Sequence, residues 1–485
     1  MRDVFLRRIA AALVFAAAAA FCPPAHADWL PNLLSAEDEA KMGAEQAPQV
    51  TKEFGGAYDN PELARYVTSI GQLLASTVEE PNVHYTFTIL NSPIVNAFSL
   101  PGGYVYVTRG LLALADDEAE LAGVMAHELG HINAHHPAQR YSRSVIAQLG
   151  LGLLGAVTKS DIASQVGGAA AQLVLMSYSR EQEFEADSRG VRYMSRAGFD
   201  PHAMAHFLSK LQANDALEAQ IAGNPGAADR FSLLATHPRT ADRVERAIAE
   251  AGEITVKEPV VARDIYLRKL DGIVYGDDPD QGIVHGQRFI HPKLRFAFEV
   301  PQGFRLINSA DAVVALGPQN ARIELDLAGN ASGMRMMTYL TSVWAKGVQL
   351  RDLETLDINN MEAATGWARL ATPEGTMDVR PVAIAFDRQT IARLFFSFPP
   401  ALSDQLSEGL RTTTYSFRRL AAGEAERVTP DRIRIVTVQA GDTVPSLSKR
   451  QPFESYSEQR FRVLNGLGPN DEVKPGTLAK IVTVE

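Results

Sequence analysis

The segment His127-Glu128-Leu129-Gly130-His131 constrains the fold of this chain more than any other feature. Two histidines four residues apart share one face of an α-helix, with their side chains about 6 Å apart. Two imidazole nitrogens at this spacing can bind one Zn²⁺ at about 2.0–2.1 Å, which leaves Glu128 beside the metal as a general base. The sequence therefore predicts a helix here and a second segment that completes a metal site.

The flanking residues favour a helix. Asp117 and Glu120 have the spacing of a capping box, which opens a helix. Apolar residues then recur at helical spacing and predict a buried face, namely Leu121, Val124, Met125, Leu129 and Ile132. For the histidine pair alone two interpretations stay open: a zinc site, or surface histidines that match the motif by chance.

A third protein ligand is needed, because catalytic zinc uses three and keeps one position open. His135 follows His131 by four residues, but on a continuous helix it would lie about 12 Å along the axis from His127. We therefore expect His135 and His136 to be solvated at the helix end, where positive charge suits the helix dipole. The spacing of the histidines also argues against a metzincin.

A downstream acidic segment offers the missing ligand. Glu183 and Asp187 are four residues apart and share a helical face. Glu183 can complete a His-His-Glu site, while Asp187 can accept a hydrogen bond from a ligand imidazole. Ala186 and Gly190 are small enough to let this helix approach the histidine helix closely. The alternative interpretation is a solvated acidic helix face.

Taken together, these segments resemble the gluzincin family that contains HtpX, the CAAX prenyl proteases and the periplasmic BepA-type metalloproteases. The matching pieces are Asn96–Phe98, Pro101–Val107, the H-E-x-x-H segment and Ser179–Asp187. They span roughly residues 33 to 250, about half the chain.

The resemblance implies a zinc metalloendopeptidase with one Zn²⁺ per chain. It implies His127, His131 and Glu183 as zinc ligands and Glu128 as the catalytic base. Asp187 would then have a supporting or proton-donating role.

His237 lies in a further matching segment, Thr236-His237-Pro238. In BepA-like relatives a histidine in such a segment can occupy the open zinc position, so His237 is a candidate fourth ligand or switch. A displaced imidazole can alternatively stabilise the oxyanion. A third interpretation is structural, since Pro238 also suits the start of a helix.

Tyr104, Val105 and Tyr106 belong to a predicted strand, because aromatic and β-branched residues favour strands. In the family this is an edge strand, to which an unfolded substrate can add by main-chain hydrogen bonds. The alternative is an ordinary core strand.

Residues 1–27 are predicted to be a cleavable secretory signal. Arginines precede the apolar run Ile9–Phe21, which is short for a membrane span, and Ala25-His26-Ala27 suits cleavage. We therefore expect a periplasmic protein, with association with the membrane or cell wall as a further option.

Composition narrows the functional class. The only cysteine, Cys22, would leave with the signal, so the mature chain would be stabilised by burial of its apolar residues rather than by disulfides. A net charge of −10 argues against nucleic-acid binding, which requires a basic surface.

The pattern predicts a multidomain chain. We expect a mainly α-helical zincin catalytic domain with a small β-sheet at 28–275, an α+β domain at 285–422, and a small βααβ LysM-like domain at 433–485. Within the first, residues 144–176 suit a helical hairpin or flap, or core helices.

The central domain is predicted from period-two alternation. Strands are expected around 294–300, 323–327, 382–386 and 394–398, with helices near 334–346 and 402–410. Its Phe296–Phe304 segment is faintly similar to PsbP-like domains, and we expect a binding or packing module.

The last segment resembles LysM modules through Gly441-Asp442-Thr443, Asn465-Gly466 and Pro475-Gly476. LysM modules bind peptidoglycan-type glycans. Pro445 departs from the family pattern, so contacts within the protein are the alternative role.

We therefore expect a secreted zinc endopeptidase that acts on unfolded, misfolded or unassembled cell-envelope proteins, in protein quality control. The main alternative is a periplasmic chaperone or peptidoglycan-binding protein with a latent metal site. A third hypothesis is a cell-wall enzyme, because LysM modules often accompany peptidoglycan hydrolases.

Overall fold

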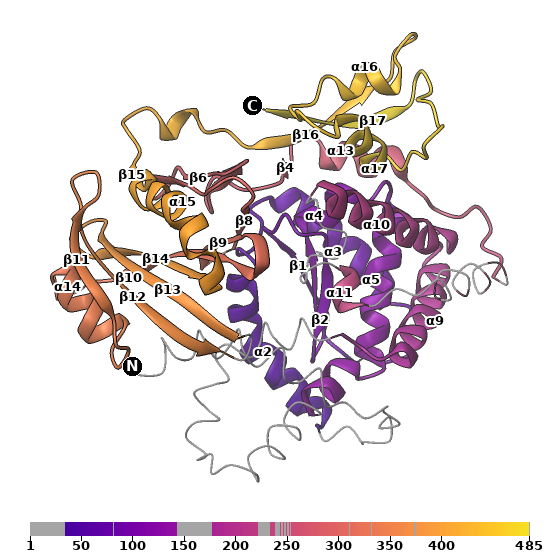
Figure 1. Cartoon of the computed structure of the whole chain (residues 1–485). Coiled ribbons are helices and arrows are strands. Elements are labelled where there is room, and N and C mark those ends of the chain that lie inside the picture. The colour runs from indigo at the N-terminus through magenta and orange to yellow at the C-terminus, as the bar shows by residue number, and fades with distance from the viewer. Residues whose placement is uncertain are drawn as a thin grey trace. The chain divides into compact units, whose positions relative to one another are not determined.

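The computed structural model contains two compact units, and Figure 1 shows the elements of each. The larger unit joins Trp29–Gly276 to Pro430–Glu485, and in the described part of the chain the smaller unit is Asp277–Thr429. The structure describes residues 34–80, 82–142, 177–221, 233–237, 243, 246, 249, 252, 254–309, 311–330, 332–372 and 375–484. The expected signal at 1–27 and the expected hairpin at 144–176 lie outside these ranges.

A three-stranded sheet organises the larger unit. Its order is β1 (Thr86–Leu90), β3 (Tyr104–Thr108), β2 (Ala97–Leu100), with β1 parallel to β3 and β2 antiparallel to it. Helix α5 (Glu118–Asn133) packs against this sheet, and α9 (Arg180–Arg196) packs on α5.

Further helices surround this centre. They are α2 (Ala36–Glu53), α3 (Pro61–Ala75), α4 (Arg109–Leu114), α10 (His202–Ile221), α11 (Leu233–Thr236) and α13 (Arg263–Leu270). Among the described helices, none combines the length and apolar character required to cross a bilayer.

Caps fix where the two central helices begin. The Asp117 side chain accepts a 2.8 Å hydrogen bond from the Glu120 amide at the start of α5, as expected for an N-cap. Ser179 and Gln182 form a reciprocal capping box at the start of α9. Helix α5 is buried along most of its length, which explains why its sequence is apolar on more than one face.

The C-terminal segment has the order β16 (Asp431–Thr437), α16 (Val444–Ser448), α17 (Ser457–Leu464), β17 (Leu478–Val484). This is the expected β-α-α-β order, while its identity as a LysM module stays a prediction. Strand β16 pairs with β17 and with β4 (Val274–Tyr275), and so continues a sheet that begins in the 29–276 part of the unit.

A buried lysine attaches this segment to the junction between α4 and α5. The ammonium group of Lys480 is fully buried and donates to the carbonyl oxygens of Ala113, Leu114 and Ala115, at 3.0, 3.1 and 2.7 Å. Its Nζ also lies 3.0 Å from a carboxylate oxygen of Asp116. Because the last carbonyls of a helix lack intrahelical partners, Lys480 acts as a C-terminal cap of α4.

The smaller unit is built from antiparallel sheets. Seven strands lie in the order β11 (Arg351–Asp357), β12 (Glu362–Thr372), β13 (Gly375–Ala385), β14 (Thr390–Phe398), β10 (Arg322–Gly329), β9 (Ala312–Leu316), β8 (Arg305–Asn308). Four more lie in the order β15 (Arg418–Arg419), β7 (Phe296–Glu299), β6 (Arg288–His291), β5 (Ile283–His285).

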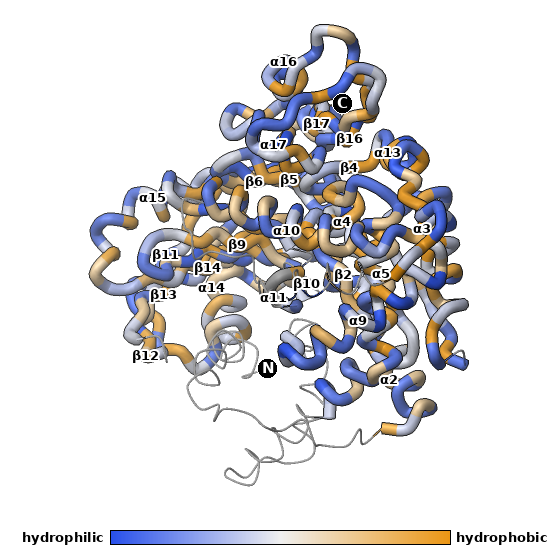
Figure 2. Tube along the Cα trace, turned by 90° about the vertical axis from the view of Figure 1, so that its right-hand side faces the viewer, coloured by the Kyte–Doolittle hydropathy of each residue, from blue (hydrophilic) through white to orange (hydrophobic). Residues whose placement is uncertain are grey.

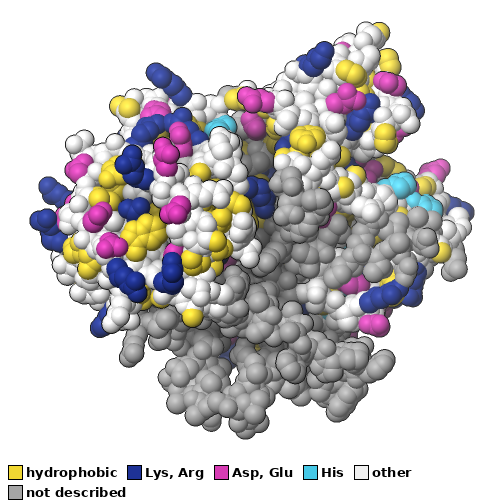
Figure 3. Space-filling model, in the orientation of Figure 1, with side chains coloured by type: hydrophobic (Ala, Val, Ile, Leu, Met, Phe, Trp, Pro, Cys, Tyr) yellow, Lys and Arg dark blue, Asp and Glu magenta, His cyan; other side chains and the backbone are white. Residues whose placement is uncertain are grey.

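Helices cover this smaller unit where the sequence predicted them. They are α14 (Met336–Tyr339) with the π-helical turn η3 (Leu340–Trp344), and α15 (Ser403–Ser416); short 3₁₀ turns lie at Pro318–Asn320, Pro400–Leu402 and Ala425–Arg427. Figure 2 shows hydrophilic and hydrophobic residues interspersed along the trace. Acidic and basic side chains are intermixed on the face of the molecule seen in Figure 3.

Candidate metal centre

Small residues bring α5 and α9 into close contact. A methyl group added at Gly190 would lie 3.0 Å from the backbone nitrogen of His127, and one at Gly130 would lie 2.8 Å from the carbonyl oxygen of Ala186. Ala186 and Gly190 therefore let α9 approach α5 closely, as the sequence predicted. Any larger residue at these positions would push Glu183 on α9 away from the histidines on α5.

Four buried side chains present one ligand atom each to a common point. They are His127, His131, Glu183 and His237, and these atoms all lie within 4.8 Å of one another. From His127 Nε2 the distances are 3.0 Å to His131 Nε2, 3.2 Å to His237 Nδ1 and 3.7 Å to Glu183 Oε2. Glu183 Oε1 lies 3.4 Å from His131 Nε2 and 3.0 Å from His237 Nδ1.

These separations fit a tetrahedral zinc site. Ligand atoms about 2.05 Å from a tetrahedral zinc ion lie about 3.3 Å from one another, in the middle of the observed spread. The donor types also fit, since zinc prefers imidazole nitrogen and carboxylate oxygen in this combination. Burial lowers the pKa of His131 well below its usual value, which keeps this imidazole neutral and able to bind a metal.

Asp187 orients the first histidine. Its carboxylate lies 2.9 Å from His127 Nδ1 and receives two hydrogen bonds of 2.7 Å from the guanidinium of Arg243. Arg243 Nη1 also lies 2.5 Å from Glu183 Oε2. Burial opposes ionisation of Asp187, but the bonds from His127 and Arg243 outweigh it and hold the pKa of this carboxyl below its usual value.

The contact between Asp187 and His127 also changes the pKa of His127. Burial disfavours the charged imidazole, yet the hydrogen bond and charge of Asp187 raise the pKa of His127 above its usual value. Burial also disfavours the ionised form of Glu183, but His237 and His131 outweigh it and set its pKa well below the usual value. Ionised carboxylates at 183 and 187 are what a cation site requires.

His136 corrects the expectation that both histidines after the motif are solvated. His136 is 2% exposed, and its Nδ1 lies 2.8 Å from His131 Nδ1. The prediction assumed a continuous helix, but α5 ends at Asn133 and His135 adopts a left-handed backbone (φ 54°), which interrupts the helix. His135 itself is partly exposed and bonds Glu39 at 2.9 Å.

Glu128 is fully buried and faces the metal centre. Its Oε2 accepts a 2.9 Å hydrogen bond from the hydroxyl of Ser99 on β2. Its Oε1 accepts no hydrogen bond from the described residues and lies 3.4 Å from His237 Nε2. One carboxylate oxygen is therefore held in place while the other is open to a reactant.

The His237 segment lies beside β2. The Leu233 amide donates to the Val95 carbonyl at 3.0 Å, and the His237 amide donates to the Leu233 carbonyl at 2.8 Å. His237 is 4% exposed. The structure thus brings His237 next to the other three candidate ligands, while its role as a fourth ligand or switch stays a prediction.

Tyr178 is a site residue that sequence reasoning missed. Its ring stacks on the imidazole of His131 at a centroid distance of 3.9 Å, and the guanidinium of Arg140 lies 4.3 Å from its centroid. Ser99, Arg140 and His136 were missed as well. No spacing rule links these residues to the motif, because turns and separate strands deliver them.

The expectation of an edge strand at 104–107 is wrong. β3 lies between β1 and β2, so both of its hydrogen-bonding edges are occupied within the sheet. Tyr104, Val105 and Tyr106 therefore cannot pair with an added strand, and Val105 and Tyr106 are buried core residues. The outer strand on the side of the metal centre is β2, which carries Ser99.

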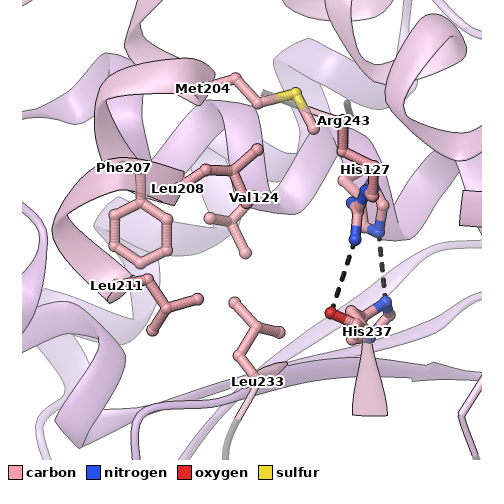
Figure 4. A pocket seen from close by; sticks show the side chains of 9 residues that line it. All are labelled: Val124, His127, Met204, Phe207, Leu208, Leu211, Leu233, His237 and Arg243. Carbon is pink, nitrogen blue, oxygen red and sulfur yellow. Dashed lines mark hydrogen bonds between the residues drawn. The ribbon is translucent and has the colours of Figure 1, made fainter. Parts of the chain in front are cut away.

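A small pocket with a mainly apolar lining adjoins the metal centre. Figure 4 shows His127 and His237 facing one another at one end of it, with apolar side chains at the other. The apolar residues that line it are Val124, Met204, Phe207, Leu208, Leu211 and Leu233.

Comparisons with known proteins match this part of the chain. Residues 61–251 match the model of peptidase family M48. The chain is 30% identical over 259 residues to the "Beta-barrel assembly-enhancing protease" of Escherichia coli (strain K12), which covers 50% of this chain and 51% of that protein. It is 28% identical over 233 residues to the "Mitochondrial metalloendopeptidase OMA1" of Schizosaccharomyces pombe, covering 47% of this chain and 65% of that protein.

The chain thus spans about half the length of the first curated relatives it matches. Among solved structures, cyanobacterial PsbP from Synechocystis sp. PCC 6803 is similar with a TM-score of 0.22 and 16% identity, over 30% of this chain and 98% of that chain. This score is too low to support a shared fold, so the PsbP-like character of 285–422 stays a prediction. The histidine–glutamate cluster lies within residues 61–251, the segment that matches the model of peptidase family M48.

Proposed function

We propose that this protein is a zinc-dependent endopeptidase that hydrolyses peptide bonds in unfolded or unassembled cell-envelope proteins. The observation that carries the proposal is a cluster of four buried ligand atoms, all within 4.8 Å of one another, beside the carboxylate of Glu128, whose Oε1 accepts no hydrogen bond from the described residues. The family match and the names of the relatives support it.

Zinc bound by His127, His131 and Glu183 would supply Lewis-acid chemistry, which polarises a scissile carbonyl and lowers the pKa of water toward about 7. Glu128 Oε1 accepts the proton of the attacking water and later delivers it to the leaving amine. Ser99 holds the other oxygen of this carboxylate, so the proton is handled at one defined atom.

Asp187 has a positioning role in this account. Its carboxylate holds the Nδ1–H tautomer of His127, which leaves Nε2 free for the metal. Because Arg243 and His127 lower its pKa, Asp187 stays ionised and is a poor proton donor.

His237 would keep the resting enzyme latent. With His237 as fourth ligand the site is closed, as in structural zinc sites, whereas catalysis needs one open position. Displacement of the His237 side chain would open that position. The displaced imidazole could then lie near the oxyanion, which is the competing role.

The apolar side chains beside His127 offer an apolar surface to substrates with exposed apolar side chains, which folded proteins hide. The "Beta-barrel assembly-enhancing protease" relatives are named for β-barrel assembly, and because β-barrels span bacterial outer membranes this motivates the cell envelope as the place of action. We accordingly propose that the protein is periplasmic and that its partners are unassembled envelope proteins.

Two variants test the hydrolase. Glu128→Gln should keep zinc and lose casein cleavage by about 10²-fold or more, because the general base is removed. His237→Ala should raise casein cleavage if His237 blocks the fourth zinc position at rest, because the substitution opens that position. A fall with His237→Ala would instead assign this imidazole to transition-state stabilisation.

The exposed Glu181 on α9 supplies the control, and Glu181→Gln should match the wild type. Casein cleavage that survives both Glu128→Gln and removal of metal by a chelator would refute the proposal.

The closed metal site also favours a second candidate, a periplasmic chaperone or peptidoglycan-binding protein with a latent centre. If Glu128→Gln retains full activity in suppressing aggregation of unfolded envelope proteins, the chaperone function does not depend on hydrolysis.

Co-sedimentation of the full chain with purified peptidoglycan tests whether the LysM-like segment binds this glycan. Here Gly466 faces Asp116, where a methyl group would lie 2.2 Å from a carboxylate oxygen, so this part of the segment is already in contact with the 29–276 part of the larger unit.

A further inference from the structure

The two histidines of α5 differ in what holds their outer nitrogens. A histidine that binds zinc through Nε2 leaves Nδ1–H for a second partner, and this partner fixes the tautomer and the ring orientation. For His127 the partner is the carboxylate of Asp187, 2.9 Å away. For His131 the nearest partner is the imidazole of His136, with 2.8 Å between the two Nδ1 atoms.

The position of protons follows from this contact. Two ring nitrogens 2.8 Å apart require one proton between them. Since His131 Nε2 faces the metal centre, 3.4 Å from Glu183 Oε1, its proton belongs on Nδ1. His136 Nδ1 must then be the acceptor, so the His136 proton sits on Nε2, which lies 3.5 Å from Glu185 Oε2.

Charge explains why an imidazole suits this position. The Asp187 carboxylate is balanced by two hydrogen bonds from the buried Arg243. A second buried carboxylate facing His131 would need its own cation, because an unpaired buried charge is costly. A neutral imidazole accepts the same hydrogen bond without adding charge.

The backbone delivers His136 to this place. Helix α5 ends at Asn133, the left-handed residue His135 interrupts the helix, and residues 136–142 form a second helix. His136 is 2% exposed, and its ring centroid lies 5.0 Å from that of His131.

We propose that His136 is a positioning residue of the zinc site, a neutral imidazole that accepts the Nδ1–H of His131 and holds its Nε2 toward the metal. This rests on the proposed function. It assigns to His136 the task that Asp187 performs for His127.

Zinc affinity tests the proposal, measured by competition with a chromophoric chelator. His136→Phe keeps the ring volume but removes the acceptor, and should weaken zinc binding about 10- to 100-fold. His136→Gln restores an acceptor oxygen and should recover most of the affinity. His202→Phe, the same change at an exposed histidine of α10, should leave it unchanged.

Equal zinc affinity for His136→Phe and His202→Phe would overturn the proposal, as would a zinc affinity of His136→Gln no higher than that of His136→Phe. If the wild type itself binds no zinc, the proposed function fails instead.

A second measurement needs no variant. In the zinc-loaded full chain, ¹⁵N-resolved NMR of the histidine rings should show His131 protonated at Nδ1 and His136 protonated at Nε2. A His136 ring that carries its proton on Nδ1, or on both nitrogens, would overturn the proposal even if His136→Phe does not fold.

Discussion

Replacing Lys480 tests whether the C-terminal segment is a structural part of the larger unit. Lys480→Met keeps the apolar stem but removes the donor to three carbonyl oxygens and the ion pair with Asp116. Burial lowers the pKa of Lys480 to about 7, which shows that removing the ammonium group from water costs free energy. Lys480→Met does not have this desolvation cost. Asp116 also keeps Lys210, at 2.5 Å.

The free energy of unfolding that Lys480→Met loses is therefore smaller than the sum of the contributions of the lost hydrogen bonds and ion pair. Breaking one partner of a buried ion pair costs about 3–5 kcal/mol. We take the lower end, about 3 kcal/mol, because Lys210 still neutralises Asp116. At about 2–4 °C per kcal/mol for a unit of this size, the melting temperature should fall by roughly 6–12 °C.

Scanning calorimetry of the full chain measures this shift. The transition of the larger unit is identified because it moves when zinc is removed and returns when zinc is restored. Lys474→Met is the matched control, since Lys474 is exposed in the same segment and its loss should change stability by less than about 0.5 kcal/mol. A Lys480→Met transition as high as that of Lys474→Met would refute the role assigned to this lysine.

Two further predictions concern packing and pH. Gly190→Val should lower zinc affinity and melting temperature together, because its side chain would displace α9 from the backbone of His127; unchanged zinc affinity would show that the helix contact does not set the site. In the smaller unit, burial lowers the pKa of His291 from 6.5 to about 4. The unfolded state thus binds more protons at His291 between these values, and the free energy of unfolding falls as the pH drops from 6.5 toward 4. His291→Phe should flatten this slope in urea unfolding followed by the fluorescence of Trp344 and Trp367, and equal slopes would contradict the assignment.

Local spacing was sufficient to predict the centre of the site. His127 and His131 share a helix face because four residues nearly complete a turn, and the same holds for Glu183 and Asp187. The small residues Ala186 and Gly190 indicated a close helix contact, which the structure contains. Period-two alternation likewise placed several strands of the smaller unit.

The positions of His136, β3 and Lys480 could not be predicted from the sequence. They depend on where helices end and on how distant strands pair. His136 was expected in solvent because the helix was assumed to continue, whereas a single left-handed residue at His135 redirects the chain. β3 was expected at an edge, but strand order arises from long-range pairing that a local pattern does not encode. The position of Lys480 has the same origin, since its partners lie more than three hundred residues earlier.

The central claim is that one zinc ion is bound by side chains of α5 and α9. X-ray absorption at the zinc edge, on full chain carrying a measured metal content, tests it most directly. The account predicts one zinc per chain with only nitrogen and oxygen ligands at about 2.0–2.1 Å, and loss of that zinc in Glu183→Ala. A chain that binds no zinc, or that keeps the same zinc environment in Glu183→Ala, would contradict it.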